Sequence, residues 1–377
     1  MTLRDVVIIG AGASGSTAAF HLAKAGKTVT LLEMNEQGRL KPCGGGMASV
    51  VQQWFPFDLM PVVDEVINRV DFSWNLGDPV FAELPGSSPF WIVKREKLDD
   101  FLSTKAIEAG AEMLRPFKVT SIEKHSEYWQ VTNSVGAQLQ ARAVVIADGS
   151  KSPWPSKFGL GPTKQHHAFT TSVRIDRRGN LKEGTTRFEF GLVKHGFAWA
   201  FPLSGGVNIG IGSFIGTHAT NRQLVLEQLL PSLGFDPKEG TRQDGLLRVW
   251  NGHYPLNSNG LIAIGDAASL CDPFLAEGLR PALLSGYEAA CSIISWLEGD
   301  NKDLNDYTKT MRNKWGDSVA WGRRISQVFY RFPKVGYQLG IKRPTAPQRI
   351  AEILSGKMGY GDIATRVIKR LLFSAPK

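Results

Sequence analysis

VVIIGAGASG, residues 6–15, is the stretch that decides the fold of this chain. Four apolar residues predict a buried strand, and the pattern GxGxxG follows them directly. In a strand–turn–helix unit Gly10 permits the tight turn, and Gly12 lets the backbone approach a pyrophosphate. Gly15 lets the helix pack closely on the strand. This unit predicts a Rossmann-type nucleotide site.

The residues after the glycines support the same prediction. A helix is expected from Ala13 to Ala25, so that the amides of Ala13 and Ser14 and the helix dipole face the phosphates. Thr28 to Leu32 predicts the second parallel strand, which ends at Glu33. A carboxylate at this place accepts the ribose hydroxyls and repels a 2′-phosphate, which argues against NADP in this site.

A second nucleotide-binding piece lies far along the chain, in LIAIGDAA, residues 261–268. Gly265 and Asp266 follow an apolar strand, where Asp266 can accept hydrogen bonds from a polyol such as ribityl. Between the two pieces, Asp148 and Gly149 end another apolar strand, at a place where they can approach the pyrophosphate. Three separated pieces suit a dinucleotide longer than NAD, and so predict FAD.

Two further segments are expected to contact the flavin ring. The loop KPCGGG, residues 41–46, lets the backbone of Cys43, Gly44 and Gly45 approach a planar ligand. The segment from Pro273 to Leu279, including Gly278, offers a helix N-terminus to the electron-rich pyrimidine edge of the flavin.

The order of predicted elements indicates a two-lobed α/β protein with discontinuous domains. The FAD-binding domain is predicted over residues 1–66, 94–160 and 255–300. An inserted antiparallel-sheet substrate domain is predicted over residues 67–93 and 161–254, with strands at 169–174, 185–190, 196–201 and 207–211. Residues 301–377 are predicted to form a basic helical C-terminal region. The three cysteines, Cys43, Cys271 and Cys291, have neither disulfide nor metal spacing, so no metal is expected.

The basic charge belongs to the C-terminal region. Residues 301–377 carry 16 Lys and Arg against 5 Asp and Glu, whereas residues 1–300 carry 28 against 30. Pairs such as Arg323-Arg324, Lys342-Arg343 and Lys369-Arg370 stand among apolar residues, which favours peripheral contact with an anionic membrane. A solvated helical face is the alternative. No nucleic-acid recognition module accompanies the charge, so no nucleic-acid partner is expected. With neither a signal peptide nor an apolar run of spanning length, we expect a cytoplasmic protein.

Several motifs together resemble the FAD-dependent geranylgeranyl reductase family, within the wider group of aromatic-hydroxylase-like flavoproteins. They extend from one end of the chain to the other: GAGASG, KPCGGG, VKREKLDDFL (93–102), ADGSKS (147–152), GFAWAFP (196–202), GDAASLCDPFLAEGL (265–279) and AEILSGKMGYGDI (351–363). The resemblance implies FAD as cofactor and a long-chain isoprenoid as substrate. The motif KPCGG resembles that of the plant and cyanobacterial branch of the family, whose members saturate geranylgeranyl chains.

The resemblance also implies roles for single residues. Arg95 would contact the adenosine or phosphates of FAD, although a surface arginine at a helix start is the alternative. Phe197, Trp199 and Phe201, with Pro202, would form an apolar wall near the reacting face of the flavin. Alternation alone also permits an ordinary sheet core.

The cysteines are interpreted separately. Cys43 is the candidate catalytic residue, because its thiol can approach the flavin or the substrate double bond. A small buried hydrophobic residue is the alternative. Cys271 and Cys291 are interpreted as packing residues.

The expected reaction is hydride transfer from reduced flavin to an isolated carbon–carbon double bond, with a proton added to the other carbon. No acid is assigned beyond Cys43 or an ordered water. The chain has no second GxGxxG unit, so the electron donor is either NADPH bound transiently or reduced ferredoxin. The basic region would then bind a diphosphate, contact a membrane surface or dock an acidic ferredoxin.

Two other functions remain open. One is a flavin-dependent monooxygenase or halogenase, because halogenases carry a strand similar to GFAWAFP. The other is a non-catalytic flavin protein that carries a lipid or transfers electrons.

Overall fold

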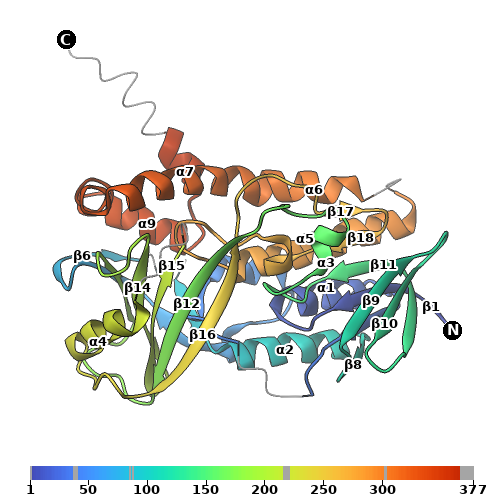
Figure 1. Ribbon diagram of the computed structural model, residues 1–377, viewed down its shortest axis with the longest axis horizontal. Coiled ribbons are helices and arrows are strands. Elements are labelled where there is room, and N and C mark those ends of the chain that lie inside the picture. Colours follow the sequence, from blue (N-terminus) through green and yellow to red (C-terminus); the bar gives the residue numbers. More distant parts are fainter. Residues whose placement is uncertain are drawn as a thin grey trace, which may run out of the picture.

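The computed structural model describes residues 2–36, 41–84, 86, 89–214, 221–300 and 304–365. Two lobes lie side by side along its long axis, and a layer of C-terminal helices covers both of them (Figure 1). The α/β architecture predicted from the sequence, a Rossmann-type unit beside an antiparallel-rich sheet, is confirmed. The exact domain boundaries given above stay a prediction.

The first lobe contains an eight-stranded sheet built around the opening motif. β1 pairs in parallel with β2 on one side and with β11 on the other, and β11 pairs in parallel with β18. The GAGASG and GDAA segments therefore leave the same edge of one sheet, because carboxyl ends of parallel strands meet there. Its strands are β1 (Leu3–Ile9), β2 (Val29–Leu32), β8 (Glu112–Leu114), β9 (Val119–Lys124), β10 (Trp129–Asn133), β11 (Gln138–Ile146), β17 (Asn257–Ser258) and β18 (Leu261–Ala263).

The second lobe contains a seven-stranded sheet in the order β16-β12-β15-β14-β13-β5-β6. Most neighbours are antiparallel, as predicted, but β13 pairs with β5 in parallel. Local sequence patterns cannot reveal such a pairing between distant segments. The strand β16 was also not predicted. The strands are β5 (Arg69–Trp74), β6 (Gly77–Glu83), β12 (His166–Ile175), β13 (Thr185–Phe190), β14 (Gly196–Leu203), β15 (Gly206–Ser213) and β16 (Thr241–Val249).

A third, three-stranded sheet is built from residues between 46 and 93. It pairs β7 (Phe90–Val93) with β3 (Gly46–Ala48) and β4 (Val63–Ile67). β7, the last strand of the predicted 67–93 segment, thus does not join the seven-stranded sheet. Its pairing with β3 fixes the end of the KPCGGG loop.

The helices cover the sheets, and α6 and α7 form the upper layer in Figure 1. They are α1 (Ala13–Lys24), α2 (Arg95–Glu108), α3 (Trp154–Lys157), α4 (Arg222–Ser232), α5 (Leu279–Glu298), α6 (Asn305–Met311), α7 (Asp317–Arg331), α8 (Pro333–Gly336) and α9 (Ala346–Leu354). Short 3₁₀ segments cover Ser49–Trp54, Met60–Val62 and Gly265–Ala268, and π-helical segments cover Arg312–Gly316 and Tyr337–Ile341.

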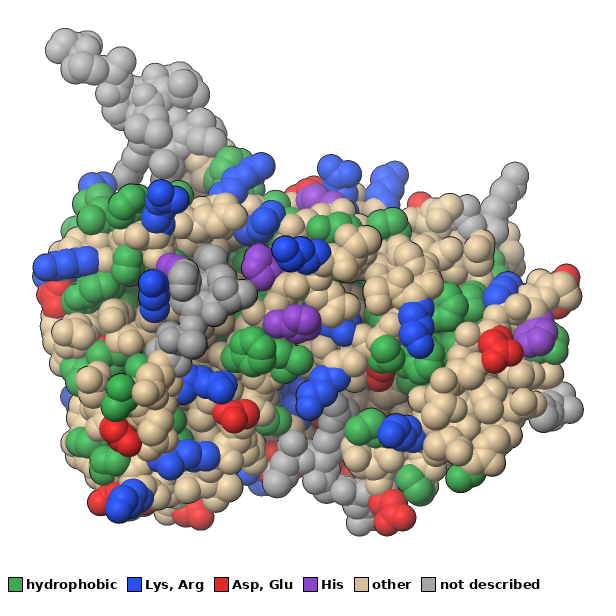
Figure 2. Space-filling view, viewed as in Figure 1, with side chains coloured by type: hydrophobic (Ala, Val, Ile, Leu, Met, Phe, Trp, Pro, Cys, Tyr) green, Lys and Arg blue, Asp and Glu red, His purple; other side chains and the backbone are tan. Residues whose placement is uncertain are grey.

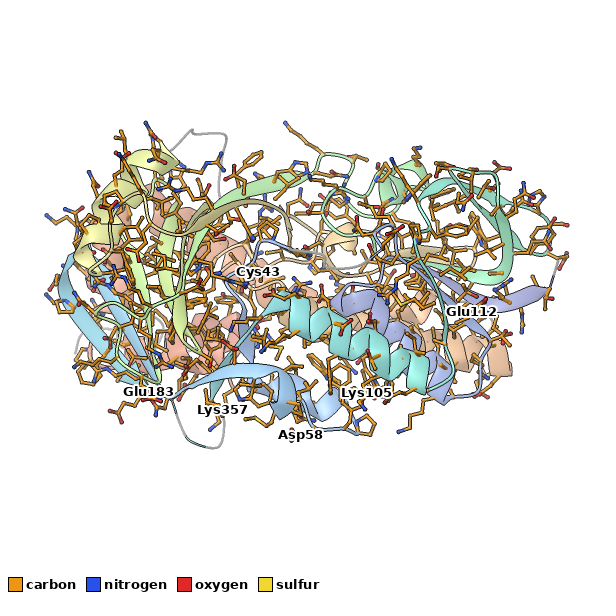
Figure 3. The ribbon with its side chains drawn as sticks, turned by 90° about the horizontal axis from the view of Figure 1, so that it is seen from below. Cys43, Asp58, Lys105, Glu112, Glu183 and Lys357 are labelled. Atoms are coloured by element: carbon orange, nitrogen blue, oxygen red, sulfur yellow. The ribbon has the colours of Figure 1, made fainter. Side chains whose placement is uncertain are left out.

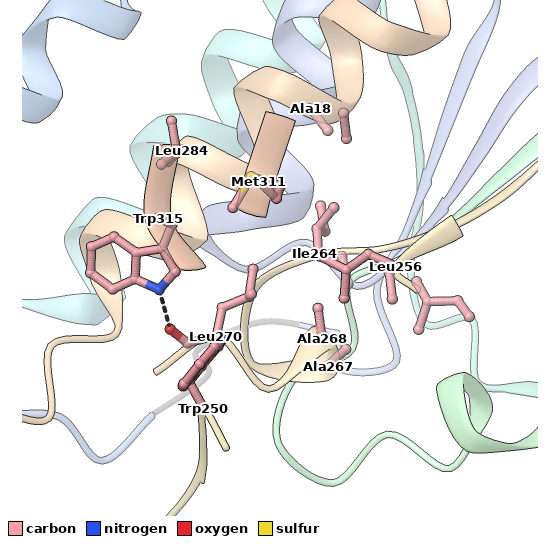
Figure 4. Close-up of a cluster of buried hydrophobic side chains, with 14 of the residues drawn as sticks. Ala18, Trp250, Leu256, Ile264, Ala267, Ala268, Leu270, Leu284, Met311 and Trp315 are labelled. Carbon is pink, nitrogen blue, oxygen red and sulfur yellow. Dashed lines mark hydrogen bonds between the residues drawn. The ribbon is translucent and has the colours of Figure 1, made fainter. Parts of the chain in front are cut away.

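The C-terminal layer is joined to the first lobe by a buried core. Trp315, in the π-helical segment, donates its indole N–H to the Leu270 carbonyl at 2.8 Å (Figure 4). Leu284 of α5, Met311 of α6 and Trp250 belong to the same core. The described part of the basic region, residues 304–365, is mostly helical, as predicted, and packs on the segment that follows Asp266.

The close approach of α1 and α5 depends on glycine. A Cβ on Gly286 of α5 would lie 2.4 Å from the backbone oxygen of Ser14 in α1. A Cβ on Gly15 would lie 1.9 Å from the Gly10 oxygen. Gly286 thus allows the two halves of the nucleotide signature to come together, and Gly15 lets α1 pack on the turn that follows β1.

We expect Gly286→Val to separate α5 from α1. The free energy of unfolding should fall by about 2–3 kcal/mol, the cost of overpacking a tight core, and FAD should be lost on purification. Urea denaturation and the flavin absorbance of the purified protein measure both effects. Cys291→Val is the matched control, since it puts the same side chain on an exposed position of the same helix. An equal effect of the two variants would contradict this account.

Candidate functional site

A large cavity lies between the two lobes and contains about 1160 Å³ of space free of protein atoms, part of it open to solvent. Two helix N-termini and a glycine-rich loop form one side, and aromatic residues of the seven-stranded sheet form the other. The sequence-predicted residues that line it are Gly12, Ala13, Ser14, Cys43, Gly44, Gly45, Arg95, Gly149, Phe197, Trp199, Phe201, Asp266, Gly278 and Leu279. Residues distant in the sequence thus converge on one space.

The first helix N-terminus is that of α1. Its N-cap is Gly12, no side chain caps the helix, and its first turn holds no acidic residue. The first-turn amides therefore remain available for an anion, which is the arrangement that binds a pyrophosphate. Gly10 itself has a φ of +104°, and a Cβ there would lie 2.6 Å from the Ala147 oxygen. Gly10 and Gly15 do not line the cavity but permit its shape.

The predicted ribose acid lies in a second cavity, of about 810 Å³, beyond the other side of this turn. The Oε2 atom of Glu33 accepts from the amide of Ala11 at 3.3 Å, and its Oε1 accepts from Asn35 Nδ2 at 2.8 Å. These bonds hold the Glu33 carboxylate against the first glycine turn. The two cavities on either side of that turn fit the two ends of an extended dinucleotide.

The second helix N-terminus is that of α5, whose N-cap Gly278 and first residue Leu279 line the large cavity. No side chain caps this helix and its first turn holds no acid. Asp266 lines the cavity nearby, and its Oδ2 pairs with Lys41 Nζ at 3.1 Å. The pairing with Lys41 was not predicted. This ion pair fixes the position of the side chain predicted to bind the ribityl chain.

Other predicted residues lie next to the cavities rather than in their walls. Asp148 lies between Ala147 and Gly149, which line the large cavity. Gly265 has a φ of +60°, and its amide donates to the hydroxyl oxygen of Ser285 in α5 at 2.9 Å. Pro273 and Pro202 line neither cavity.

Arg95 is buried, so its interpretation as a surface arginine is wrong. Its guanidinium bonds both carboxylate oxygens of Asp99, one turn along α2, with Nη2 at 2.9 and 2.8 Å. Burial opposes the charged form, but Asp99, together with Cys43 and Asp266, raises the pKa of Arg95 above its usual value. The result is a fixed positive charge in the cavity wall, suited to an anionic ligand.

Cys43 lies near the centre of the molecule, between the seven-stranded sheet and the end of α2 (Figure 3). Its Sγ accepts from the Gly45 amide at 3.3 Å, and its carbonyl accepts from Asn208 Nδ2 at 3.1 Å. Asn208 in turn accepts from the indole N–H of Trp199 at 3.2 Å. The aromatic strand and the KPCGGG loop are therefore linked through Asn208, which sequence reasoning missed.

The aromatic wall belongs to both the core and the cavity. Phe197, Trp199 and Phe201 are buried in the main hydrophobic cluster and line the cavity as well. The backbone at Gly44 approaches this wall so closely that a Cβ would lie 3.0 Å from the Phe201 ring. The apolar wall and the ordinary sheet core, the two interpretations of GFAWAFP, are thus compatible, since the same three side chains belong to the core and line the cavity.

Arg248 was also missed by sequence reasoning. It is buried, and it donates to the backbone oxygens of Ser152 and of Ala267, the latter at 3.4 Å. Burial lowers the pKa of Arg248, while Asp148 and Asp266 oppose that change. This arginine therefore ties the ADGSKS and GDAA segments together.

Of the two cysteines interpreted as packing residues, one is buried and the other is exposed. Cys271 is buried, as predicted, whereas Cys291 is exposed, and its interpretation as a packing residue is wrong. In a helix packed on one side only, the position within the turn decides burial, and Cys291 falls on the outer side. Lys369-Arg370 lies outside the described residues. Within the described ranges, no helix is both long and apolar enough to cross a membrane.

Comparisons with known proteins agree with this geometry. Residues 5–59 match the family model described as DAO, FAD dependent oxidoreductase. The chain is 28% identical to a menaquinone reductase of Mycobacterium tuberculosis, over 88% of this chain and 85% of that protein. It is also 28% identical to digeranylgeranylglycerophospholipid reductase 2 of Methanothermobacter thermautotrophicus, over 86% of this chain and 87% of that protein.

Solved structures share the fold. A geranylgeranyl bacteriochlorophyll reductase-like protein of Thermoplasma acidophilum superposes with a TM-score of 0.80 at 21% identity, covering 94% of this chain and 92% of that one. A flavin-dependent brominase gives a TM-score of 0.73 at 20% identity, covering 99% and 100%. The predicted resemblance to geranylgeranyl reductases is confirmed. The chain is an FAD-dependent oxidoreductase, and FAD is its cofactor.

We expect Asp266→Ala to weaken FAD binding about 10-fold, the loss of one hydrogen bond to a charged group. The substitution also leaves Lys41 without its partner. Isothermal titration of the apoprotein with FAD measures the change in Kd. Asp176→Ala, at an exposed position outside both cavities, is the control. An unchanged Kd for Asp266→Ala would exclude Asp266 from the flavin site.

Proposed function

We propose that this protein reduces isolated carbon–carbon double bonds in a long-chain isoprenoid, by hydride transfer from reduced FAD and addition of a proton. The observation that carries the proposal is the aromatic wall opposite the flavin-facing loop. Five aromatic residues of that lobe line the cavity: Phe188, Phe197, Trp199, Phe201 and Phe214. A wall of this kind suits a hydrocarbon chain and excludes water from it.

The names of the two relatives support the same substrate class. One is named for menaquinone and the other for a digeranylgeranyl glycerophospholipid. Both compounds carry long isoprenoid chains with isolated double bonds. An apolar cavity that holds the isoprenoid chain, with the head group outside it, would accept both compounds.

The residues would divide the work as follows. The amides of α1 and Glu33 hold the two ends of the ADP part, and Asp266 holds the ribityl chain. FAD supplies the hydride when bound and reduced. The α5 N-terminus favours negative charge on the flavin pyrimidine edge, since its dipole points positive charge at the cavity. An alkene has no carbonyl to polarise, so orientation between the aromatic wall and the flavin must supply much of the rate.

Cys43 is proposed to position the alkene against the flavin. Its carbonyl and Sγ are both engaged with neighbours, which holds the thiol at the cavity wall. The electron donor is proposed to be NADPH, bound transiently, or reduced ferredoxin.

An oxygen-using activity is the second candidate, because the brominase shares the fold over the whole of both chains. Reduced enzyme mixed with air distinguishes it, since a monooxygenase or halogenase would yield hydroxylated or halogenated product. A lipid or electron carrier would yield neither product.

The central test is anaerobic. Purified protein is reduced with dithionite and mixed with geranylgeranyl diphosphate or a geranylgeranyl lipid, and flavin absorbance is followed. We expect reoxidation of the flavin together with a product that is heavier by two hydrogens per reduced bond. Reduced flavin that persists in the presence of both compounds would contradict the proposal.

The C-terminal helices are proposed to hold the protein on the membrane that contains its substrate. Val328, Phe332, Val335 and Leu339 are each more than half exposed, within one short stretch of α7, α8 and the π-helical segment after them. Exposed basic residues lie next to them in the sequence, namely Arg331, Lys334 and Lys342. Hydrophobic and basic groups meet over the left end of this layer (Figure 2). We call these four residues the apolar stripe. A stripe bordered by cations suits an anionic lipid surface.

The opposite side of the same helix faces the cavity wall. Phe329 packs against Phe190 with ring centroids 5.4 Å apart, and Phe190 packs against Phe197 at 5.9 Å. Phe197 lines the cavity. A membrane on the apolar stripe would therefore be separated from the cavity by the helix itself and by the rings of Phe329 and Phe190.

We expect the protein to sediment with vesicles of phosphatidylglycerol and much less with vesicles of phosphatidylcholine. The double substitution Phe332→Ser and Leu339→Ser should weaken this binding at least ~10-fold, because two large apolar side chains no longer enter the lipid. Val135→Ser, at an exposed position of the other lobe, is the control. Full vesicle binding by the double variant would exclude the stripe.

A further inference from the structure

The loop between the GDAA segment and α5 contains two buried carboxyl groups, Asp272 and Glu277. They lie beside the large cavity but differ in how their oxygens are used. Both oxygens of Asp272 accept hydrogen bonds, whereas one oxygen of Glu277 has no partner among the described residues.

Asp272 is fully engaged in holding the loop. Its Oδ1 accepts from the amides of Phe274 and Leu275 at 2.6 and 3.1 Å, and its Oδ2 accepts from the Tyr360 hydroxyl at 2.6 Å. Its own amide donates to the Glu277 carbonyl at 3.0 Å. Asp272 is therefore a positioning residue that closes the loop and sets the backbone at Glu277.

Glu277 lines the cavity, and one of its oxygens is unused. Its Oε2 pairs with Arg280 Nη2 at 2.7 Å, one turn along α5. Its Oε1 is buried and has no hydrogen-bond partner within the described part of the chain. A buried carboxyl oxygen without a partner is costly, and its presence at a cavity points to a ligand or a reaction there.

The backbone supports the same interpretation. Ala276, directly before Glu277, also lines the cavity and has a φ of +56°, in the left-handed region that favours glycine. Such strain persists where the surrounding structure imposes it, often at a functional site. Here the turn brings Glu277 to the cavity just before α5 begins.

Resting on the proposed function, we propose that Glu277 is the acid that protonates the substrate. The π bond of the alkene breaks as one carbon gains the hydride from reduced FAD and the other gains the carboxyl proton of Glu277. FAD returns to its oxidised form, and two new C–H bonds are formed. Glu277 is left as a carboxylate paired with Arg280, and it regains a proton from solvent water before the next turnover.

The other titratable groups of the cavity wall are already committed. Asp266 pairs with Lys41, and Arg95 pairs with Asp99. The Cys43 sulfur accepts from the Gly45 amide. Among the described residues that line the cavity, Glu277 is the acid whose side chain has a buried oxygen without a hydrogen-bond partner.

The charge around Glu277 suits a proton donor at neutral pH. Burial raises the pKa of Glu277 to about 7, with Arg280 opposing the rise and Asp272 adding to it. The groups that face it are Arg280, Asp272, Tyr360 and Cys271, from the loop, α5 and the segment after α9. Since the folded pKa is raised, the protonated acid is present below about pH 7 and is lost as the pH rises through that value.

The test uses the FAD-loaded full chain with Glu277→Gln, Glu277→Asp and, as control, Glu239→Gln, which alters an exposed ion pair with Arg177. FAD content is checked first, and each protein is reduced and mixed anaerobically with the geranylgeranyl compound. We expect Glu277→Gln to retain FAD but reoxidise it about 100-fold more slowly, the usual contribution of a general acid. Glu277→Asp should regain part of the rate, and Glu239→Gln should match the unaltered protein.

A second measurement does not depend on turnover. The infrared band of a protonated carboxylic acid, followed from pH 5 to pH 9 in oxidised holoenzyme, should titrate near neutral pH and be absent in Glu277→Gln. Wild-type reoxidation rate in Glu277→Gln, or an infrared titration that survives the substitution, would overturn the assignment. If the unaltered protein itself fails to reduce any isoprenoid, the proposed function fails, and the infrared titration still decides whether Glu277 holds a proton at neutral pH.

Discussion

The close packing of α1 on α5 is the constraint on which the rest of the structure depends. Gly286 meets the Ser14 backbone across this interface, where a side chain would not fit. The contact aligns two helices that start at the same edge of one parallel sheet, so both N-termini face one cavity. One N-terminus suits the pyrophosphate and the other the flavin ring. A single interface thus converts two separated motifs into one FAD site.

The parts of the site that the sequence predicted are those set by local chain geometry. GAGASG, Glu33, Asp266 and the α5 start follow from strand–turn–helix units whose spacing is fixed by backbone conformation. The strand formed by GFAWAFP was likewise predicted from the alternation of its aromatic residues. Arg95 was assigned by family likeness, and its burial could not be judged from a helix-start position alone.

What could not be predicted depends on contacts between distant segments. The Lys41–Asp266 pair, the Asn208 link from Trp199 to the Cys43 carbonyl, and the parallel pairing of β5 with β13 all join remote residues. Glu277 was visible as part of a helix start, but its unused oxygen depends on the tertiary structure. Cys291 was misplaced because helix membership alone does not decide which side of α5 is covered.

In the proposed function, the apolar cavity, the flavin and Glu277 act together to reduce isolated double bonds. This function requires that the isoprenoid chain lies between the aromatic wall and the flavin ring. A crystal structure of the holoenzyme with a saturated isoprenoid product tests this claim most directly. The account predicts a chain carbon against the flavin, with Trp199 and Phe201 on its other side and the Glu277 carboxyl within reach. A chain bound elsewhere, with the space beside the flavin filled by ordered water, would contradict it.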